Sequence, residues 1–339
     1  MENPIFLQSL QLNRVLSFRA TRIRFQNLNI LIGPNGSGKS NLLDILELII
    51  DCPVSNEQLD RFFSPRGGLS AWYWQDTTFI EIPSISVQVK IPGIRWNVDI
   101  PPVIDKGAYW NCIWDDGTKP GEEAPLSLMH IYPCFDFDRN ASSLLPQSES
   151  RGSQATLSKN LGNIQQVLRY AFNHADPEFK DKINIRLKEL NPDFEALVVH
   201  EHEGYIFTHL IEGNKKIPLS RLSSGTLKYL CLILILCNPT PPPFIAIDEP
   251  DLGLHPDMLP SLKEMLVEAS EKTQVLITTH SDILVSLFSD TPEVVMVCEK
   301  DSIGSTQIKR LDPKTLKNGL KKHSLGDLWT KGMLGGTRW

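Results

Sequence analysis

The sequence predicts an α/β fold in which a mixed, largely parallel sheet is flanked by helices. The apolar run at 28–32 leads into a glycine-rich loop, and from Ser40 onward apolar residues recur at helical spacing. In the last third, strand-like runs at 244–248 and 275–279 alternate with helix-like stretches at 224–237 and 259–270. Because this alternation is typical of a parallel sheet covered by helices, we expect the first and last thirds to form one domain.

The N-terminal part of the chain is expected to supply strands. Residues 5–32 contain two strand-like runs, IFLQSLQL and RIRFQNLNILI, and the second leads directly into the glycine-rich loop. The runs FIEIPSISVQVKI and IRWNVDI alternate apolar and polar residues, which is the pattern of antiparallel strands with one solvated face. We therefore expect an antiparallel β subdomain beside the core sheet.

The middle of the chain is predicted to be an inserted region with helices and a hairpin. Its expected features are a loop over 101–125, a Ser-rich connector over 140–156, helices over 160–172 and 177–190, and turns at Glu203-Gly204 and Gly213-Asn214. Two more strands are expected near Val294 and Gln307. The predicted organisation is a single domain over 1–339, divided into 1–100, an inserted 101–219 and 220–339.

Composition excludes several classes of protein. The 339 residues are 41% hydrophobic and 22% charged, which is typical of a folded globular chain. The net charge of -6 gives no global reason to bind nucleic acid or an acidic membrane. The N-terminus lacks the pattern of a signal peptide, and the longest apolar run, YLCLILILC, is too short to span a bilayer. We expect no membrane association.

The cysteines predict a reducing compartment. Six of them are scattered along the chain without a CxxC pair or a Cys/His spacing typical of zinc sites. Neither a disulfide framework nor a structural zinc is therefore expected. The predicted location is the cytoplasm.

The stretch Gly33–Ser40, GPNGSGKS, fits the phosphate-binding pattern GxxxxGK[ST]. Its glycines let backbone N–H groups surround a β-phosphate at a helix N-terminus, and Lys39 adds positive charge. The Ser40 hydroxyl can ligate Mg²⁺. The alternative is a glycine-rich turn without a ligand, which the strand before it and the helix after it make less favourable.

The stretch FIAIDEP supplies acidic residues at the end of a buried strand. Asp248 can hold Mg²⁺ through water, and Glu249 can orient or deprotonate the attacking water. Two acids at a strand end can also simply begin a turn. The phosphate loop upstream favours the catalytic interpretation, because each of the two sites requires the other.

Two further stretches complete a nucleotide site. LSSGTLKYL at 222–230 places small residues and a glycine at the start of a predicted helix, where anions are favoured. ITTHS places His280 at the end of a strand, where an imidazole can reach a γ-phosphate or its water. Either feature alone is usually structural, but the four stretches in this order favour an ATPase.

With these four stretches, the sequence resembles the ABC-type ATPase heads of RecF, SMC and overcoming-lysogenization (OLD) proteins, within the AAA_21-type predicted ATPases. GPNGSGKSNLL resembles their Walker A, LSSGTLK their signature, IDEP their Walker B, DLGLHP their D-loop and TTHS their switch histidine. The tail SLGDLWTKGMLGGTRW is similar to that of compact, arm-less members. The resemblance is strong over about 1–50 and 220–339 and weak between them.

The resemblance implies a Mg²⁺-dependent ATPase with an ABC-type head fold, whose sites are shared by two protomers. In such a homodimer, or a larger homo-oligomer, the signature of one protomer faces the γ-phosphate held by another. The implied catalytic residues are Lys39, Glu249 and His280, the last as the switch that contacts the γ-phosphate. The implied Mg²⁺ ligands are Ser40 and Asp248. The implied nucleotide contacts within one protomer are Gly33, Asn35, Gly36, Ser37, Gly38, Lys39, Ser40 and Asn41, and those from the other protomer are Ser224, Gly225 and Asp251.

The sequence departs from the family pattern at two places. The signature reads SSGT where transporters have SGGQ, so the Ser224 side chain stands where a glycine backbone acts elsewhere. This favours the RecF and OLD side of the family. No motif fixes the glutamine that should ligate Mg²⁺; Gln75 and Gln88 are both candidates. The residue that contacts adenine is equally open.

The resemblance to arm-less OLD-like ATPases implies a switch that controls a separately encoded effector, a nuclease or toxin, in bacterial antiphage defence. The chain ends soon after the ATPase motifs, which is why we expect the effector to be another protein. The alternative is a RecF-like ATPase of DNA repair or recombination. A transporter subunit and a scaffold with vestigial hydrolysis are two further hypotheses, and the former is disfavoured by the SSGT signature.

Nucleic acid is a possible partner. Residues 300–322 carry seven Lys or Arg against two Asp, a local excess that could contact a phosphate backbone. A solvated helix face is the commoner reason for such a run. The sequence leaves both interpretations open.

Overall fold

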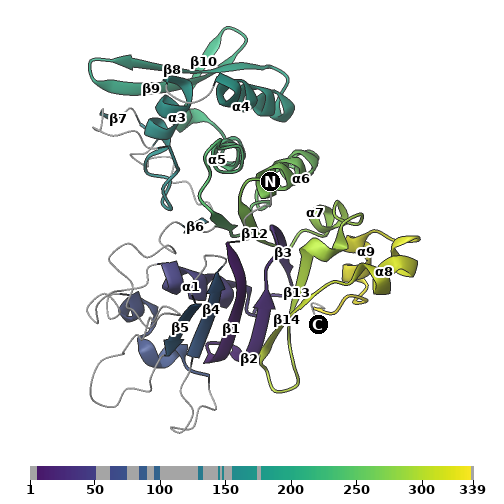
Figure 1. Ribbon diagram of the computed structural model, residues 1–339. Helices are drawn as coiled ribbons and strands as arrows, with labels where there is room; N and C mark the ends of the chain where they lie inside the picture. Colours follow the sequence, from purple (N-terminus) through teal and green to yellow (C-terminus); the bar gives the residue numbers. More distant parts are fainter. Residues whose placement is uncertain are drawn as a thin grey trace. The chain divides into compact units, whose positions relative to one another are not determined.

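The computed structural model describes most of the chain in two compact units (Figure 1). The described residues are 6–50, 62–74, 84–89, 95–99, 129–132, 144–145, 147–148, 155–173 and 177–336. The first unit comprises Met1–Ile131, Pro242–Asp248 and Thr273–Trp339, and the second comprises Tyr132–Pro241 and Glu249–Lys272. The predicted loop at 101–125 and Gln75 lie outside the described residues. The single-domain organisation and its bounds at 100 and 219 stay predictions.

A six-stranded sheet forms the centre of the first unit (Figure 1). Its order is β14 (Thr306–Arg310), β13 (Val295–Lys300), β3 (Leu28–Ile32), β12 (Gln274–Thr279), β11 (Phe244–Ile247) and β6 (Met129–Tyr132). β13, β3, β12 and β11 run parallel, while β14 is antiparallel to β13. Residues of β3, β12 and β11 are buried throughout, as strands covered on both faces require. The predicted α/β class with a mixed, largely parallel sheet is confirmed.

A second, antiparallel sheet of the first unit has the order β2-β1-β4-β5. Its strands are β2 (Phe18–Arg24), β1 (Leu7–Val15), β4 (Ser84–Val89) and β5 (Arg95–Asp99). The predicted antiparallel subdomain is thus confirmed. The prediction of two strands before the glycine loop is wrong, because RIRFQNLNILI divides into β2 and β3. The Asn29 amide oxygen accepts from Gln26 N at 2.9 Å and stabilises the turn between them.

Helix α1 (Lys39–Ile50) follows the glycine loop and packs its apolar face into the core of the first unit. That core also contains side chains of β1, β3, β11 and β12, among them Leu10, Leu31, Phe244 and Leu276. Short 3-10 helices lie at η1 (Ser64–Arg66), η2 (Leu69–Trp72) and η7 (Pro292–Val294). The phosphate loop is therefore held between a buried strand and a buried helix.

Three further helices close the first unit: α7 (Asp282–Ser286), α8 (Pro313–Leu320) and α9 (Leu325–Thr330). α9 crosses α7 with almost no space between them, because a Cβ atom on Gly326 would lie 2.1 Å from the Asp282 carbonyl oxygen. The segment after α9 continues to Gly336, whose N–H donates to the Glu299 carboxylate at 3.1 Å. The tail is thus fastened to α7 at one end and to β13 at the other.

The described residues of the second unit form an antiparallel sheet and four α-helices (Figure 1). The sheet contains β7 (Gln147–Ser148), β8 (Phe194–His202), β9 (Tyr205–Glu212) and β10 (Lys215–Pro218); the helices are α3 (Ile164–Asn173), α4 (Pro177–Leu190), α5 (Ser224–Leu236) and α6 (Leu259–Ser270), with short 3-10 helices η5 (Leu219–Arg221) and η6 (Pro256–Met258). The predicted helices and hairpin turns are confirmed, although α3 begins later than expected. α5 is buried along nearly its whole length from Leu227 onward.

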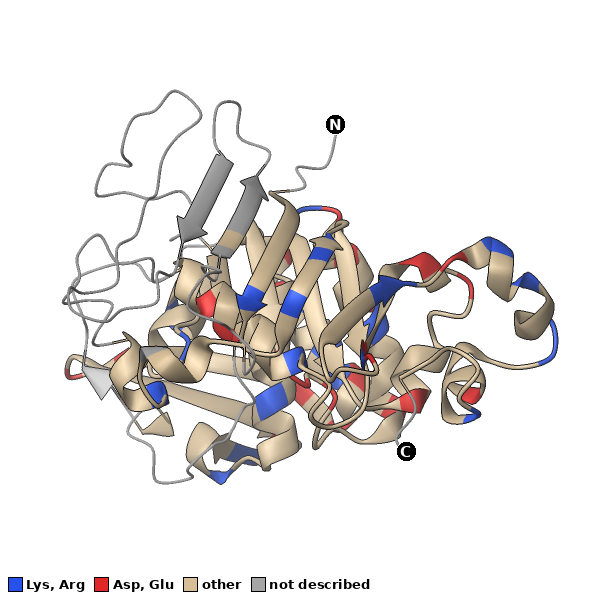
Figure 2. Ribbon diagram, turned by 90° about the horizontal axis from the view of Figure 1, so that it is seen from below, with Lys and Arg blue, Asp and Glu red and all other residues tan. Residues whose placement is uncertain are grey.

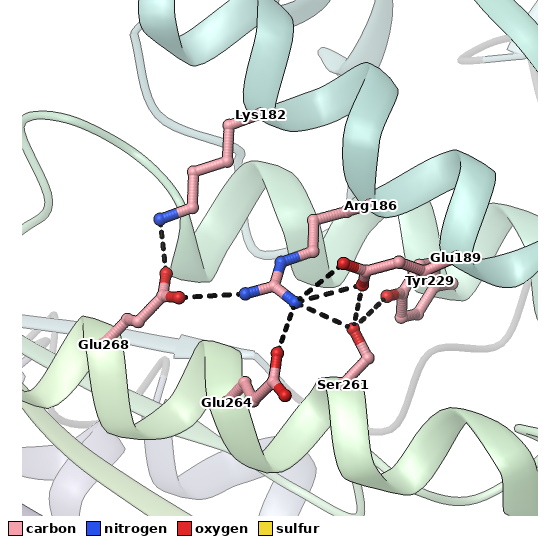
Figure 3. A network of polar contacts seen from close by, with 7 residues as sticks. All are labelled: Lys182, Arg186, Glu189, Tyr229, Ser261, Glu264 and Glu268. Atoms are coloured by element: carbon pink, nitrogen blue, oxygen red, sulfur yellow. Dashed lines mark hydrogen bonds and ion pairs between the residues drawn. The ribbon is translucent and has the colours of Figure 1, made fainter.

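Arg186 joins three of these helices through a polar network (Figure 3). Its guanidinium donates to Glu189 of α4 and to Glu264 and Glu268 of α6, at 3.0, 2.8 and 2.9 Å. Ser261 of α6 also accepts from Arg186, and its hydroxyl hydrogen-bonds to Tyr229 of α5 at 2.7 Å. Several acceptors share one buried cation, so the network fixes how α4, α5 and α6 pack.

No helix in the described part of the chain is long and apolar enough to cross a membrane.

We expect Gly326→Ala to lower the free energy of unfolding by about 2 kcal/mol, because the added methyl group would overlap the Asp282 carbonyl and push α9 away from α7. Thermal unfolding followed by circular dichroism measures this. Gly319→Ala is the matched control in the same tail: its Cβ would meet only the flexible Leu328 side chain at 3.2 Å, so its melting temperature should match or exceed that of the wild type. Equal losses in both variants would contradict the packing described here.

We expect the Glu268→Gln variant to be less stable than the wild type at pH 7 but not near pH 3. Partial burial alone would raise the pKa of Glu268, but Lys182 and Arg186 outweigh it and hold this pKa below its ordinary value. The stabilisation is therefore present above the unfolded-state pKa of about 4.3 and is lost as the pH falls through the folded-state pKa. Because the carboxylate is 44% exposed, the loss at pH 7 should be only about 2 °C in melting temperature.

Melting curves from pH 7 to pH 3 test this prediction. Glu271→Gln, at the C-terminal end of the same helix, is the control and should follow the wild type at every pH. A loss in Glu268→Gln that persists unchanged at pH 3 would contradict an electrostatic origin.

Candidate nucleotide site

The carboxyl ends of three neighbouring parallel strands bring the predicted motifs of the first unit together. β3 pairs with β12 so that Ile32 lies opposite Thr279, and β12 pairs with β11 so that Ile277 lies opposite Ile247. The glycine loop therefore begins, and Asp248 and His280 follow their strands, at one edge of the sheet. This edge is where open α/β sheets bind their ligands.

Two glycines of the loop, Gly33 and Gly38, lie too close to neighbouring atoms to carry a side chain. A Cβ atom on Gly33 would lie 2.2 Å from the Cys298 carbonyl oxygen of β13. On Gly38, which has φ +113°, it would lie 2.3 Å from Thr306 Oγ1 and 2.9 Å from Ser17 Oγ. Thr306 Oγ1 also donates to the Ser37 carbonyl at 2.7 Å. The loop is thus held from outside by β13, β14 and the β1–β2 turn.

Inside this loop lie a buried cation and an unsatisfied hydroxyl. Lys39 is 7% exposed, and its ammonium donates to the carbonyl oxygens of Gly33 and Pro34 at 2.8 and 3.1 Å. Ser37 is 2% exposed, and its Oγ has no hydrogen-bond partner among the described residues. A buried cation beside an unsatisfied buried donor fits an anionic ligand, because both groups are costly to bury otherwise. The residues therefore fit a bound phosphate.

Asp248 lies at the end of β11 and is oriented by the neighbouring strand. Thr278 Oγ1 of β12 donates a short hydrogen bond to Asp248 Oδ1. The pKa of Asp44 in α1 is raised, mainly because the side chain is partly buried. The negative charges of Glu47 and Asp248 raise it further. Ser40 and Asp44 share a face of α1, because they are four positions apart. Their oxygen atoms and that of Asp248 are the hard donors that Mg²⁺ prefers.

Glu249 directly follows Asp248 in the chain and begins the second of the two segments that form the second unit. Its φ of +46° is in the left-handed region, which non-glycine residues rarely adopt. It begins a tight turn, since Leu252 N donates to the Glu249 carbonyl at 3.1 Å, and the predicted D-loop continues through Asp251. Strained backbone of this kind is concentrated at functional sites.

The predicted signature forms the N-terminus of α5 in the second unit. Ser223 is the N-cap, and its hydroxyl accepts from Thr226 N at 3.0 Å. Ser224 is exposed and Gly225 is half-buried. The helix terminus is thus satisfied locally at one N–H while the Ser224 side chain stays open to solvent.

His280 occupies the junction between β12 and α7 and is half-buried. The next residue, Ser281, caps α7 by accepting from Leu284 N at 3.1 Å. α9 packs on this same helix through Gly326. The position of His280 is therefore fixed on one side by the sheet and on the other by the C-terminal tail.

A pocket of about 630 Å³ opens beside the helix that follows the glycine loop. Its lining includes Leu16 and Ser17 of the β1–β2 turn, Asn41 of α1, and Tyr73 and Trp74. Asn41 Nδ2 donates to Ser17 Oγ at 2.8 Å, which connects the pocket to the phosphate loop. Its volume and aromatic side chains are suitable for a nucleoside.

A smaller pocket of about 240 Å³ lies against the loop residues 34–37. Glu299, Lys300 and Gly336 complete its lining, and Lys300 also contributes to the larger pocket. The Glu299 carboxylate accepts hydrogen bonds from Lys309 Nζ and Gly336 N, which hold the pKa of Glu299 below its ordinary value. The tail thus contributes backbone to the surroundings of the phosphate loop.

The structure brings together some of the predicted residues and leaves others in separate units. The glycine loop, Asp248 and His280 share the first unit, whereas Ser224, Gly225, Glu249 and Asp251 share the second. Gln88 lies in β4 opposite Ser9, and Gln75 lies outside the described residues, so the glutamine ligand stays open.

Sequence reasoning missed several polar groups of the site. Thr278, Asp44 and Thr306 were not considered, although Thr278 lies inside the motif ITTHS. The aromatic residues Tyr73 and Trp74 were also missed. Each of these residues reaches the site through contacts between segments that are distant in the sequence.

Comparisons with known proteins agree with this geometry. The family model AAA_21, described as "AAA domain, putative AbiEii toxin, Type IV TA system", matches residues 28–94 and 118–286. A stretch of 71 residues is 42% identical to the protein named Old nuclease of Escherichia phage P2. That stretch covers 21% of this chain and only 12% of the length of the nuclease.

Solved structures of SMC heads have the same fold. A head in complex with the C-terminal domain of ScpA, from Pyrococcus furiosus, superposes with a TM-score of 0.62 at 11% identity and covers 94% of this chain and 99% of its own. A head bound to the C-winged helix domain of ScpA gives 0.61 at 13% identity, covering 91% and 99%. The head from Thermotoga maritima gives 0.50 at 19% identity, covering 91% and 100%. The ABC-type head fold inferred from the motifs is confirmed.

We expect Thr278→Val to raise the Mg²⁺ concentration needed for half-maximal ATP turnover about tenfold, because valine keeps the shape but cannot orient Asp248. A Mg²⁺ titration of turnover at saturating ATP measures this. Ser286→Ala, which removes a hydroxyl that donates to the Asp282 carbonyl at 2.7 Å, is a control and should keep the wild-type Mg²⁺ dependence. An unchanged Mg²⁺ requirement in Thr278→Val would contradict the expectation that Thr278 orients Asp248 toward Mg²⁺.

Proposed function

Because the chain belongs to the AAA_21 family of AAA-domain proteins and has the ABC-type head fold, we propose that it is a Mg²⁺-dependent, ATP-hydrolysing switch that works as a dimer or larger homo-oligomer. The observation that carries the proposal is the edge of the core sheet, where the phosphate loop, Asp248 and His280 follow three adjacent parallel strands. A buried cation and a buried unsatisfied hydroxyl at the loop support an anionic ligand there.

In this proposal the first unit binds the nucleotide. Backbone N–H groups of residues 35–38 surround the phosphates, and Lys39 leaves the Gly33 and Pro34 carbonyls to pair with the phosphate oxygens. The pocket that contains Asn41, Tyr73 and Trp74 takes the nucleoside. Ser40 and Asp248 would hold Mg²⁺, which neutralises charge that develops on the phosphate oxygens.

Glu249 acts as the general base in the proposed reaction. Its carboxylate takes a proton from the attacking water, and His280 contacts the γ-phosphate or that water. The fixed backbone of Glu249 supports this role, because a base must be held within hydrogen-bond reach of its proton.

We place the remaining motif residues at an interface between two protomers. Ser224 is exposed at a helix N-terminus, which suits contact with a phosphate bound by a second copy. Gly225 and Asp251 complete the proposed trans contact, and Asp251 would couple the two sites. Two solved SMC heads are bound to domains of ScpA, so heads of this fold also bind other proteins.

The proposed role of the switch is to control a separately encoded nuclease or toxin in bacterial antiphage defence, in the cytoplasm. The local likeness to a phage nuclease supports a connection with such an effector.

A RecF-like function on DNA is the second candidate, and α8 favours it. This helix buries none of its residues, and the lysines at 314, 317, 321 and 322 in and just after it are exposed. Elsewhere in the described ribbon, basic and acidic residues are interspersed (Figure 2). An increase of ATP turnover on addition of duplex DNA, lost at high salt, would favour this candidate over the effector switch.

We expect Glu249→Gln to bind ATP as tightly as the wild type while turnover falls about 100-fold or more, because the amide cannot accept the proton. Turnover by phosphate release and binding by calorimetry measure the two effects. The variant should also accumulate as an ATP-bound dimer in light scattering. Lys39→Ala should lose ATP binding altogether.

The matched control is Asp257→Asn, which neutralises an exposed acid after the same turn and should turn over at the wild-type rate. Wild-type turnover in Glu249→Gln would refute the assigned base. A wild type that binds ATP without hydrolysing it would leave the scaffold as the better function.

A further inference from the structure

One lysine is buried in the helix that carries the signature. Lys228 lies in α5 and is 4% exposed, and the residues that follow it to Leu236 are apolar and buried. Burying an ammonium group costs several kcal/mol unless polar partners replace its water. A lysine in such a helix is therefore expected to serve a specific contact.

The ammonium group of Lys228 holds the turn that begins at Glu249. Nζ donates to the Glu249 carbonyl at 2.8 Å and to the Leu252 carbonyl at 2.7 Å. Leu252 N donates to the same Glu249 carbonyl at 3.1 Å. The two ends of the turn are thus joined twice, once by the backbone and once through the side chain of Lys228.

This turn needs stabilising contacts from outside it, because the backbone of its first residue, Glu249, is strained. Glu249 has φ +46° and precedes Pro250, and a residue before proline normally adopts an extended conformation. Such backbone states are unfavourable and persist only where surrounding contacts fix them. The two hydrogen bonds from the Lys228 ammonium are charge-assisted and therefore strong enough to provide most of this stabilisation.

The same helix makes a second contact with the loop. A Cβ atom on Gly225 would lie 3.1 Å from the Gly253 carbonyl oxygen. The first turn of α5 therefore packs directly on the loop after Glu249. Lys228, one turn further along the same helix, hydrogen-bonds to that loop. Ser224, Glu249 and Asp251 are consequently carried by one rigid piece of the second unit.

We propose that Lys228 is a positioning residue for ATP hydrolysis: it fixes the strained backbone of Glu249, so that the carboxylate of the base and the signature at the start of α5 keep a constant spacing. The inference rests on the proposed role of Glu249 as the general base. Lys228 acts through main-chain carbonyls and is not itself in contact with the reacting atoms in this proposal.

The test compares Lys228→Met and Lys228→Gln with the wild type. Methionine keeps the length and apolar stem but donates nothing, so kcat for ATP should fall about 10- to 100-fold while KM and ATP affinity stay within about threefold. Glutamine can still donate one hydrogen bond and should retain more activity than methionine. Equal kcat in the wild type and Lys228→Met would overturn the inference.

Arg186→Met is the matched control. It also removes a buried cation of the second unit, but Arg186 donates to side chains of α4 and α6 and not to the Glu249 turn. Its melting temperature should fall while kcat changes little. If kcat falls in proportion to melting temperature in all three variants, or if both Lys228 variants lose cooperative unfolding, Lys228 is structural and the inference is wrong.

A double-mutant cycle separates this inference from the proposed function. If Lys228 acts only through Glu249, Lys228→Met should not slow the residual turnover of Glu249→Gln any further. Additive losses would overturn the positioning role while leaving the base assigned. Wild-type turnover in Glu249→Gln alone would refute the proposed function itself, whatever the result for Lys228.

Discussion

The pairing register of β3, β12 and β11 is the constraint on which the first unit depends. These strands are apolar and buried along their whole length, so hydrophobic contacts alone would define their register weakly. Two buried amides define it better. Asn29 donates to the Val275 carbonyl at 3.1 Å, and Gln274 both donates to and accepts from the backbone of Leu7, at 2.9 and 2.8 Å. A slip of β12 against β3 would leave these amides unsatisfied in the core, so the motifs that follow these two strands must lie at one edge.

The local chemistry of the motifs made much of the site predictable, and contacts between distant segments made the rest unpredictable. A glycine loop between strand and helix leaves few alternatives in a sequence, and α4 and α6 have the predicted bounds. The break between β2 and β3 was missed because only the two polar residues Gln26 and Asn27 mark it in the sequence. Thr278 and Lys228 were missed for a different reason: each contacts a residue of another element, which no local pattern encodes.

The phosphate loop also depends on elements far along the chain for its rigidity. The Cys298 carbonyl lies directly behind Gly33, and Cys298 Sγ donates to the Ser37 carbonyl at 3.4 Å. Trp329 Nε1 donates to the Gly336 carbonyl at 3.2 Å, which keeps the tail against β13 and the loop. A loop supported in this way needs little reorganisation when a phosphate binds, so less of the binding energy is spent on ordering it.

A buried cation holds the start of the loop that follows Glu249. The described contacts of Lys228 are to main-chain carbonyls, whose charge and direction do not change with pH or rotamer. The side chain of Leu252 is 53% exposed and Gly253 is open to solvent, so the outer side of the loop stays accessible while Lys228 holds its backbone from inside. In the proposed dimer, a second protomer that contacts this outer side would act on Glu249 through the turn that Lys228 stabilises.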